Sequence, residues 1–257
     1  MTGSDSQPTI IIERHGAVLL VTLNRPDKAN ALNPALLAGL DRAWDEAEDE
    51  SCRAVVIAAA GKNFCAGGDL AAGRAEPDAM DLRRAFHPRL LRLAALAKPV
   101  VAAINGAVAG AGLGLALAAD IRILAEDARM VPAWVQIGLV PDFGASWFAA
   151  RLIGEARTFE WFATGRVMPA AEALSIGLAS EIVSPAVLIE RALELAQALA
   201  AQPGNAVALT KRLLAQVRCH GLAEQLEAEA AASAAAHRAP EREKQVAARL
   251  ASFAKPG

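Results

Sequence analysis

The sequence predicts an α/β fold, because short apolar strands, glycine-containing loops and helical patterns follow one another in a repeated order. Residues 53–59, 100–104 and 121–124 are brief apolar runs that are typical of buried strands. Loops and helical patterns separate these runs, which indicates a core built from successive strand–loop–helix turns. From residue 155 onward the pattern is helical, with breaks at glycine and proline.

The N-terminal part of the chain predicts a hairpin followed by a helix. Residues 9–13 and 17–23 are β-branched or apolar, and they flank a turn that contains Gly16. Asn33 followed by Pro34 predicts the start of a helix that runs to about residue 48. Four large apolar side chains recur on one face of this helix: Leu36, Leu37, Leu40 and Trp44.

The later elements are predicted from similar signals. Residues 61–69 form a glycine-containing loop, and Pro88 is expected at the start of a helix that ends near residue 97. A short helix is expected from residue 111 or 112 to residue 119. Residues 222–250 are alanine-rich and amphipathic, which predicts further helix at the C-terminal end.

Size and composition suit one globular unit. The chain has 257 residues, of which 54% are hydrophobic and 21% charged. At this length roughly three quarters of the unfolded surface can be buried. We expect residues 1–195 to form the α/β core, and residues 196–257 to form a helical region that packs on the core or on a neighbouring subunit.

Charge and cysteine content exclude several classes of function. The formal net charge is −2, so neither nucleic acid nor a membrane surface is an expected partner. The three cysteines, Cys52, Cys65 and Cys219, have no paired spacing, so we expect no disulfide, no metal site and a cytoplasmic location. The first ten residues lack the features of a signal peptide. The longest apolar stretch, residues 99–117, is interrupted by Asn105 and four glycines, so no membrane span is expected.

A glycine-rich segment at residues 110–114 follows a strand and precedes a helix. It fails the dinucleotide-binding spacing, because Leu115 stands where the third glycine should be. Two interpretations remain open from the residues alone. The glycines either permit close helix packing, or let backbone N–H groups and the helix N-terminus stabilise an oxyanion.

Four motifs, taken together and in order, resemble the crotonase (enoyl-CoA hydratase/isomerase) superfamily. They are residues 24–33 (NRPDKANALN), 64–70 (FCAGGDL), 104–112 (INGAVAGAG) and the landmark at residues 165–183. The resemblance implies a spiral of repeated ββα turns with a helical C-terminal trimerisation region. It also implies a homotrimer or a dimer of trimers that acts on an acyl-CoA thioester, with coenzyme A as part of the substrate and no other cofactor.

The resemblance also implies where the site lies. By position, the backbone amides of Ala66 and Ala111 would form an oxyanion hole, which stabilises the thioester enolate. For Arg25 and Lys28, an ordinary solvated turn is the alternative to coenzyme A binding. The substrate-binding and coenzyme A-binding residues implied are Arg25, Lys28, Ala29, Ala66, Asp69, Leu70, Trp134, Phe253 and Lys255.

The chain departs from the typical hydratase pattern at two positions. Gly114 and Trp134 stand where hydratases carry their two catalytic glutamates, so hydration by that mechanism is not expected. Asp142 instead matches the acidic position of the aspartate-using acyl-CoA isomerases, in which one carboxylate can carry out a 1,3-proton shift. From local sequence alone, Asp142 could equally cap the helix predicted at residues 145–152.

His87 is a second candidate catalytic residue, although a residue before Pro88 could simply begin a helix. His87, Trp134 and Asp142 together also resemble the set in chlorobenzoyl-CoA dehalogenases, in which the aspartate attacks an aromatic carbon. We therefore keep three alternatives to an isomerase: a hydratase with unusual catalytic residues, a dehalogenase-type hydrolase, and a non-catalytic acyl-CoA-binding homologue.

Overall fold

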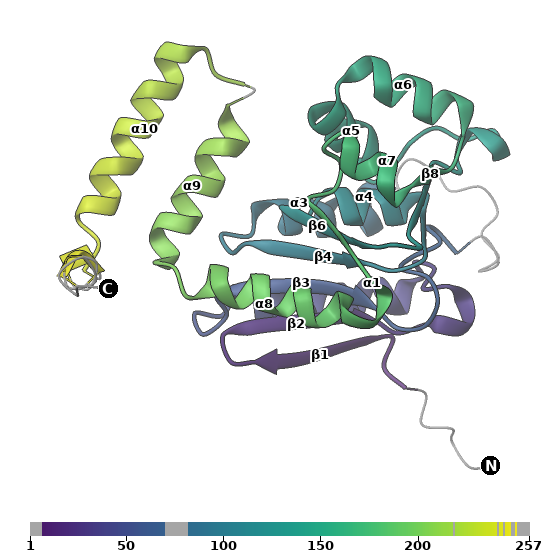
Figure 1. Ribbon diagram of the computed structural model, residues 1–257, viewed down its shortest axis with the longest axis horizontal. Helices are drawn as coiled ribbons and strands as arrows, with labels where there is room; N and C mark the ends of the chain where they lie inside the picture. Colours follow the sequence, from purple (N-terminus) through teal and green to yellow (C-terminus); the bar gives the residue numbers. More distant parts are fainter. Residues whose placement is uncertain are drawn as a thin grey trace.

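Two β-sheets with helices packed around them make up the fold (Figure 1). The computed structural model describes residues 7–69, 82–217, 219–240, 242–243, 245–247 and 250. The larger sheet has the strand order β1-β2-β3-β4-β6-β9. Its first pair is antiparallel and the other neighbours are parallel. The strands are β1 (Ile10–His15), β2 (Val18–Leu23), β3 (Ala54–Ala59), β4 (Val100–Ile104), β6 (Ile121–Ala125) and β9 (Glu181–Val183).

The smaller sheet is formed by β5 (Ala107–Ala109), β7 (Arg129–Val131) and β8 (Met168–Pro169). Strand β5 follows β4 almost directly, so the chain passes from the larger sheet to the smaller one at residues 105–106. The α/β class, the N-terminal hairpin and the three predicted buried strands are confirmed.

Helices cover both faces of the larger sheet. Alternate residues of β3 belong to two separate buried clusters, because side chains alternate between the faces of a strand. One cluster joins Val55 and Ile57 to residues of α1 (Pro34–Glu48), α3 (His87–Ala95) and α4 (Ala111–Leu117). The other joins Val56 to α8 (Leu188–Ala200), which crosses the opposite face (Figure 1).

The remaining helices lie outside these layers. They are η1 (Pro26–Lys28), η2 (Leu82–Phe86, a π-helix), η3 (Val135–Ile137), α5 (Ala145–Ile153), α6 (Glu155–Thr164), α7 (Ala170–Ser175), η4 (Pro185–Val187), α9 (Gly204–Gln216) and α10 (Leu222–His237). In Figure 1, α9 and α10 form a pair that projects away from the sheets. None of the helices in the described part of the chain is long and apolar enough to cross a membrane.

The helix ends can be compared with the local predictions. The Asn33 side chain accepts a hydrogen bond from the Leu36 N–H at 2.9 Å, as expected for the cap of α1. Helix α10 ends at His237, and Pro240, which cannot donate a helical hydrogen bond, follows closely; residues 242–243, 245–247 and 250 are helical again, so the predicted C-terminal helix is present with a break. Residue 195, where we expected the core to end, lies within α8, and the projecting helical pair begins at Gly204.

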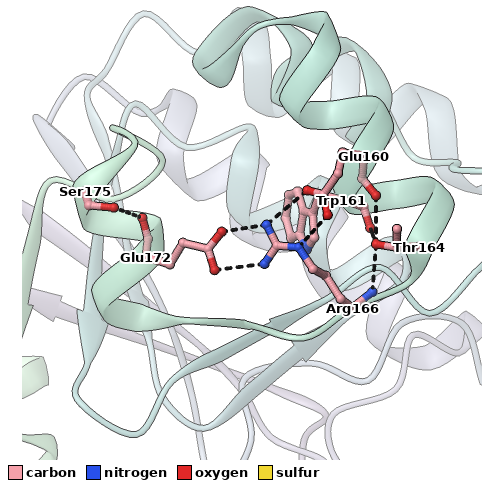
Figure 2. A network of polar contacts seen from close by, with 6 residues as sticks. All are labelled: Glu160, Trp161, Thr164, Arg166, Glu172 and Ser175. Atoms are coloured by element: carbon pink, nitrogen blue, oxygen red, sulfur yellow. Dashed lines mark hydrogen bonds and ion pairs between the residues drawn. The ribbon is translucent and has the colours of Figure 1, made fainter.

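One ion-pair network fixes the turn between α6 and β8. Arg166 donates to Glu160 at 2.8 and 3.1 Å and to both oxygens of Glu172 at 2.8 and 2.6 Å, and Figure 2 shows its guanidinium lying between the two carboxylates. The adjacent Gly165 carbonyl accepts a hydrogen bond from the Gln136 side chain at 2.9 Å. The network thus joins α6, α7 and the short helix η3.

We predict a small but measurable coupling between Arg166 and Glu172. Their side chains are about a third exposed, and exposed ion pairs contribute little, but the two-point geometry is favourable. A double-mutant cycle with Arg166→Gln and Glu172→Gln, measured by urea unfolding, should give about 0.5–1 kcal/mol of coupling. High salt should reduce this value. A coupling indistinguishable from zero would show that the ion pair contributes nothing to the free energy of unfolding.

Candidate functional site

Two loops distant in sequence lie side by side at the centre of the site. Cys65 and Val108 form a parallel bridge, in which the Ala109 N–H donates to the Cys65 carbonyl at 2.8 Å. On its other side the first loop meets the N-terminal segment, where the Leu32 N–H donates to the Gly67 carbonyl at 2.7 Å. Residues 64–69 therefore lie between residues 29–32 and residues 105–111.

Backbone hydrogen bonds decide which amides of the first loop remain free. The Ala66 N–H donates to the Ala29 carbonyl at 2.9 Å, so it is already used within the fold. The Gly67 N–H lies against the Cys65 thiol. Gly68 forms a parallel bridge with Leu32 through the hydrogen bonds of the two residues beside it, the Gly67 carbonyl and the Asp69 N–H. In such a bridge the Gly68 N–H points away from Leu32. Within the described ranges, the Gly68 N–H has no hydrogen-bond acceptor.

The expected donor Ala66 is therefore wrong, and Gly68 is the amide that the structure leaves available. The sequence did not distinguish Gly68 from Ala66, because the two residues lie only two positions apart in the same motif. Only the pairing with Ala29 and Leu32 separates them. Among described residues, the Ala111 N–H also has no acceptor, because Ala111 is the first residue of α4. Gly67 holds the loops together: a methyl group there would lie 3.2 Å from the Ala111 nitrogen.

The Cys65 thiol lies beneath this loop and is buried. It donates to the Asn30 carbonyl at 3.2 Å. Burial raises the pKa of the Cys65 thiol to about 12. Because the thiolate is the reactive form, Cys65 is not a nucleophile at neutral pH.

The predicted coenzyme A residues in the N-terminal loop have different environments. The Arg25 guanidinium pairs with Asp69 at 3.1 Å and also donates to the Ala31 carbonyl, and both members of the ion pair are largely buried. Lys28 is exposed. The Ala29 carbonyl accepts the Ala66 N–H. Arg25, Ala29 and Asp69 thus shape the loop, and Lys28 is the cation that faces solvent.

Asn30 is a site residue that sequence reasoning missed. It is fully buried and adopts a φ of 54°, a conformation that asparagine tolerates better than most residues. Its side-chain NH2 donates to the carbonyls of Ala60 at 2.9 Å and Asn63 at 2.8 Å, and its oxygen accepts from the Arg25 N–H at 2.7 Å. Asn30 therefore ties the N-terminal loop to residues 60–63, directly before the loop at residues 64–69. The predicted residues Leu70, Phe253 and Lys255 lie outside the described residues.

Asp142 lies in an aromatic environment with one direct donor. The Trp134 indole N–H donates to Asp142 Oδ1 at 2.9 Å. Burial raises the pKa of Asp142 above its usual value, although the Trp134 hydrogen bond and the nearby His87 act in the opposite direction. The Phe86 and Phe143 rings meet edge to face at 5.5 Å, which brings the segment before α3 against the segment that carries Asp142.

The capping interpretation of Asp142 is wrong. The N-cap of α5 is Gly144, with a φ of 72° and no side-chain hydrogen bond to the helix. Only the backbone carbonyl of Asp142 accepts from this helix, from the Ala145 N–H at 3.0 Å. The carboxylate is therefore not needed to begin α5.

His87 and Trp134 are placed near Asp142 in different ways. His87 is the first residue of α3, as its position before Pro88 predicts, and it is exposed yet close enough to affect the Asp142 charge. Trp134 is 4% exposed, so it is first of all a buried partner of Asp142. Across the described ranges, no three His, Cys, Asp or Glu side chains are grouped so as to hold a metal ion.

The two halves of the site meet on α4. Ala111 begins this helix and Gly114, one turn later on the same side, lies against the backbone of Phe143. Asp142 directly precedes Phe143 in the chain. A carbonyl oxygen bound at the Ala111 N–H would thus lie about one helical turn from the segment that carries Asp142.

Comparison with known proteins gives a consistent picture. The sequence model of the family "Enoyl-CoA hydratase/isomerase" matches residues 13–252. A 1,2-epoxyphenylacetyl-CoA isomerase of Escherichia coli K12 is 36% identical over 82% of this chain and 84% of its own length. A 4-chlorobenzoyl coenzyme A dehalogenase of an Arthrobacter species is 34% identical over 81% of this chain and 78% of its own length. The crystal structure of an enoyl-CoA hydratase from Polaromonas sp. JS666 superposes with a TM-score of 0.89 at 32% identity, covering 95% of this chain and 97% of the other, which confirms the expected fold.

We predict that Asp142→Asn stabilises the protein at neutral pH. Because the folded-state pKa is raised, ionising Asp142 disfavours the folded state, and this cost grows as pH rises from about 3.9 through the raised pKa. Asparagine keeps an oxygen for the Trp134 N–H and carries no charge. The melting temperature should rise at about pH 7, and the gain should shrink as pH falls toward about 4.

The matched control is Asp45→Asn, whose exposed carboxylate pairs with Arg92. It should give no stabilisation at either pH. A melting temperature of Asp142→Asn equal to or below that of the wild type at neutral pH would contradict the assignment of a burial-raised pKa.

Proposed function

Because the chain belongs to the enoyl-CoA hydratase/isomerase family, we propose that it isomerises an unsaturated or ring-derived acyl-CoA thioester, with Asp142 as the single acid and base. It is an acyl-CoA enzyme of that family. The observation that carries the finer proposal is the Asp142 carboxylate, which accepts a hydrogen bond from Trp134, is partly buried and is not used as a helix cap. A raised pKa brings such a group closer to the pH at which proton transfer in both directions is efficient.

The proposed reaction begins with polarisation of the thioester carbonyl. Its oxygen accepts hydrogen bonds from the free N–H groups of Ala111 and Gly68. These bonds stabilise the enolate that forms on deprotonation, so the γ-proton of the unsaturated thioester becomes more acidic. The Asp142 carboxylate removes the γ-proton, and the electron pair moves through the double bond to form a dienolate. The protonated Asp142 then returns the proton to the α-carbon. The double bond has shifted, and the enzyme ends in its starting protonation state.

Coenzyme A enters as part of the substrate, and we propose no other cofactor. Lys28 supports phosphate binding, since it is the exposed cation of the loop that packs on residues 64–69. Leu70, Phe253 and Lys255 remain proposed contacts. The exposed side chains of Leu214, Leu222 and Leu226 on α9 and α10 support the proposed trimer or dimer of trimers, in which these helices would be covered.

A second candidate function is hydrolysis with Asp142 as nucleophile. The joint placement of His87, Trp134 and Asp142, together with the dehalogenase relative, favours this over the remaining alternatives. In that reaction Asp142 would form an ester with an aromatic carbon as halide leaves, and water would then cleave the ester. Hydration is less well supported, because Gly114 and Trp134 supply no carboxylate.

We predict that Asp142→Asn abolishes proton transfer while substrate binding is retained. With a panel of unsaturated acyl-CoAs in deuterated water, kcat and deuterium incorporation should fall by about two to four orders of magnitude. Affinity for the thioester, measured by calorimetry, should change little, because the two oxyanion amides are untouched. Asp45→Asn serves as the control.

The same samples distinguish the alternatives. An ester adduct on Asp142 with a halogenated aromatic thioester, detected by intact-protein mass spectrometry, would favour the nucleophilic reaction. Wild-type deuterium exchange in Asp142→Asn would remove Asp142 as the proton shuttle. Thioester binding without turnover by the wild type, across the whole panel, would favour a binding protein.

We also predict that Ala111→Pro loses turnover but folds. Proline is favoured at the first position of a helix, and Ala111 occupies that position in α4. The substitution removes one oxyanion donor, which should lower kcat by about two to three orders of magnitude. Ala111→Gly keeps the N–H and should retain most of the rate. A folded Ala111→Pro enzyme, checked by circular dichroism, with the wild-type rate would show that this amide is not used.

A further inference from the structure

Gly114, a residue of α4, lies unusually close to the backbone of Phe143. A Cβ atom at this position would lie 2.0 Å from the Phe143 carbonyl oxygen, 2.9 Å from its carbonyl carbon and 3.1 Å from its Cβ. All three atoms belong to one residue, and two of them are backbone atoms that cannot rotate away as the end of a flexible side chain can. The absence of a side chain at residue 114 is therefore what lets the turn at residues 142–144 reach α4.

The turn that packs on Gly114 is itself strained. Phe143 has a φ of 45°, although it is not glycine, and Gly144 follows with a φ of 72°. This conformation costs a bulky residue about 1–2 kcal/mol, and it persists only where packing enforces it. The Phe143 ring is 1% exposed and packs edge to face on Phe86. The turn is thus held by Phe86 on the side-chain side and by Gly114 on the carbonyl side.

We infer that Gly114 is a positioning residue, whose missing side chain sets the Phe143 turn so that Asp142 meets Trp134. The inference rests on the proposed function for its catalytic consequence but not for its geometry. Asp142 is bonded directly to the residue whose carbonyl touches Gly114, and its carboxylate lies 2.9 Å from the Trp134 indole nitrogen. A shift of the turn by the distance that a methyl group requires would break that hydrogen bond.

The contact also makes two designs of active site mutually exclusive in this chain. A side chain at residue 114 of any kind needs the space that the Phe143 carbonyl occupies. A carboxylate supplied from α4 at this position would therefore displace the segment that supplies Asp142. Gly114 therefore does more than lack a carboxylate: its small size leaves room for the segment that supplies Asp142.

The test is Gly114→Ala, with the Trp134 indole as a readout that does not depend on turnover. The chain has only four tryptophans, so the indole N–H resonances in a ¹⁵N-labelled sample can be assigned, with Trp134 identified by loss of its signal in Trp134→Phe. In the wild type this resonance should follow pH as Asp142 gains its proton. In Gly114→Ala it should move toward a free indole and lose that pH dependence. The kcat should fall about 10- to 100-fold with little change in KM, because a displacement of about 1 Å can have that effect.

Gly39→Ala is the matched control. Gly39 is also a helical glycine, in α1, and a Cβ there would lie 2.5 Å from Ile10 Cγ1, a side-chain atom remote from Asp142. It should share any general loss of stability yet leave the Trp134 resonance and the acidic limb of the pH–rate profile unchanged. If Gly114→Ala does not fold, Gly114→Ala/Phe143→Gly gives the turn the freedom to move away from α4. The double variant should fold, and its Trp134 indole resonance should still move toward a free indole and lose its pH dependence.

An unchanged Trp134 resonance and its pH dependence in the folded Gly114→Ala variant, or in the double variant, would overturn the inference. Loss of the resonance shift in Gly39→Ala as well would do the same, since the effect would then be general. If the wild type turned over none of the thioesters, the proposed function would fail, while the indole measurement would still decide whether Gly114 positions Asp142.

Discussion

The backbone contact between residues 64–68 and residues 107–111 is the constraint on which the site depends. The bridge between Cys65 and Val108 fixes both loops, and the pairing with residues 29–32 consumes one side of the first loop. Two N–H groups, from Gly68 and Ala111, are left without an acceptor among the described residues; they belong to different loops but flank the same contact at Gly67. Ala111 is buried and Gly68 is exposed. A buried unpaired donor is costly, so the Ala111 N–H in particular is a group that a ligand could satisfy.

Sequence reasoning succeeded where the signal is local or carried by several motifs. The strands, the Asn33 cap and the start of α3 at His87 follow from alternation, capping chemistry and the effect of proline. The family follows from four motifs in order. It failed between Ala66 and Gly68, because which amide is free depends on partners more than thirty residues away. Asn30 was missed for the same reason, since two of its three side-chain hydrogen bonds reach Ala60 and Asn63, which are close to it only in the folded chain.

Asp142 shows how a correct position can have an ambiguous local explanation. Aspartate is a preferred N-cap residue, so its place between a proline and a glycine just before a helix suggests capping. Only the structure, in which Gly144 is the N-cap of α5, removes the capping explanation for Asp142. Arg25 shows the opposite case. Its charge suggested an anion site, but in the fold its guanidinium pairs with Asp69 and donates to the Ala31 carbonyl. Thus a cation near a glycine loop can be part of the wall of a site without facing its ligand.

Two local costs fall on consecutive residues, and this coincidence argues that residues 142–144 are kept for chemistry. Burial opposes the charge of Asp142, and the left-handed backbone of Phe143 stores strain. The Asp142 carboxylate is not required by the helix that follows, because Gly144 begins α5 without help from the Asp142 side chain. Sequences usually agree with their folds at each local level and depart from that agreement at functional sites. Here the departure lies beside a carboxylate with one indole donor, on the segment that packs against α4, the helix that Ala111 begins. This placement supports the proposed proton transfer by Asp142.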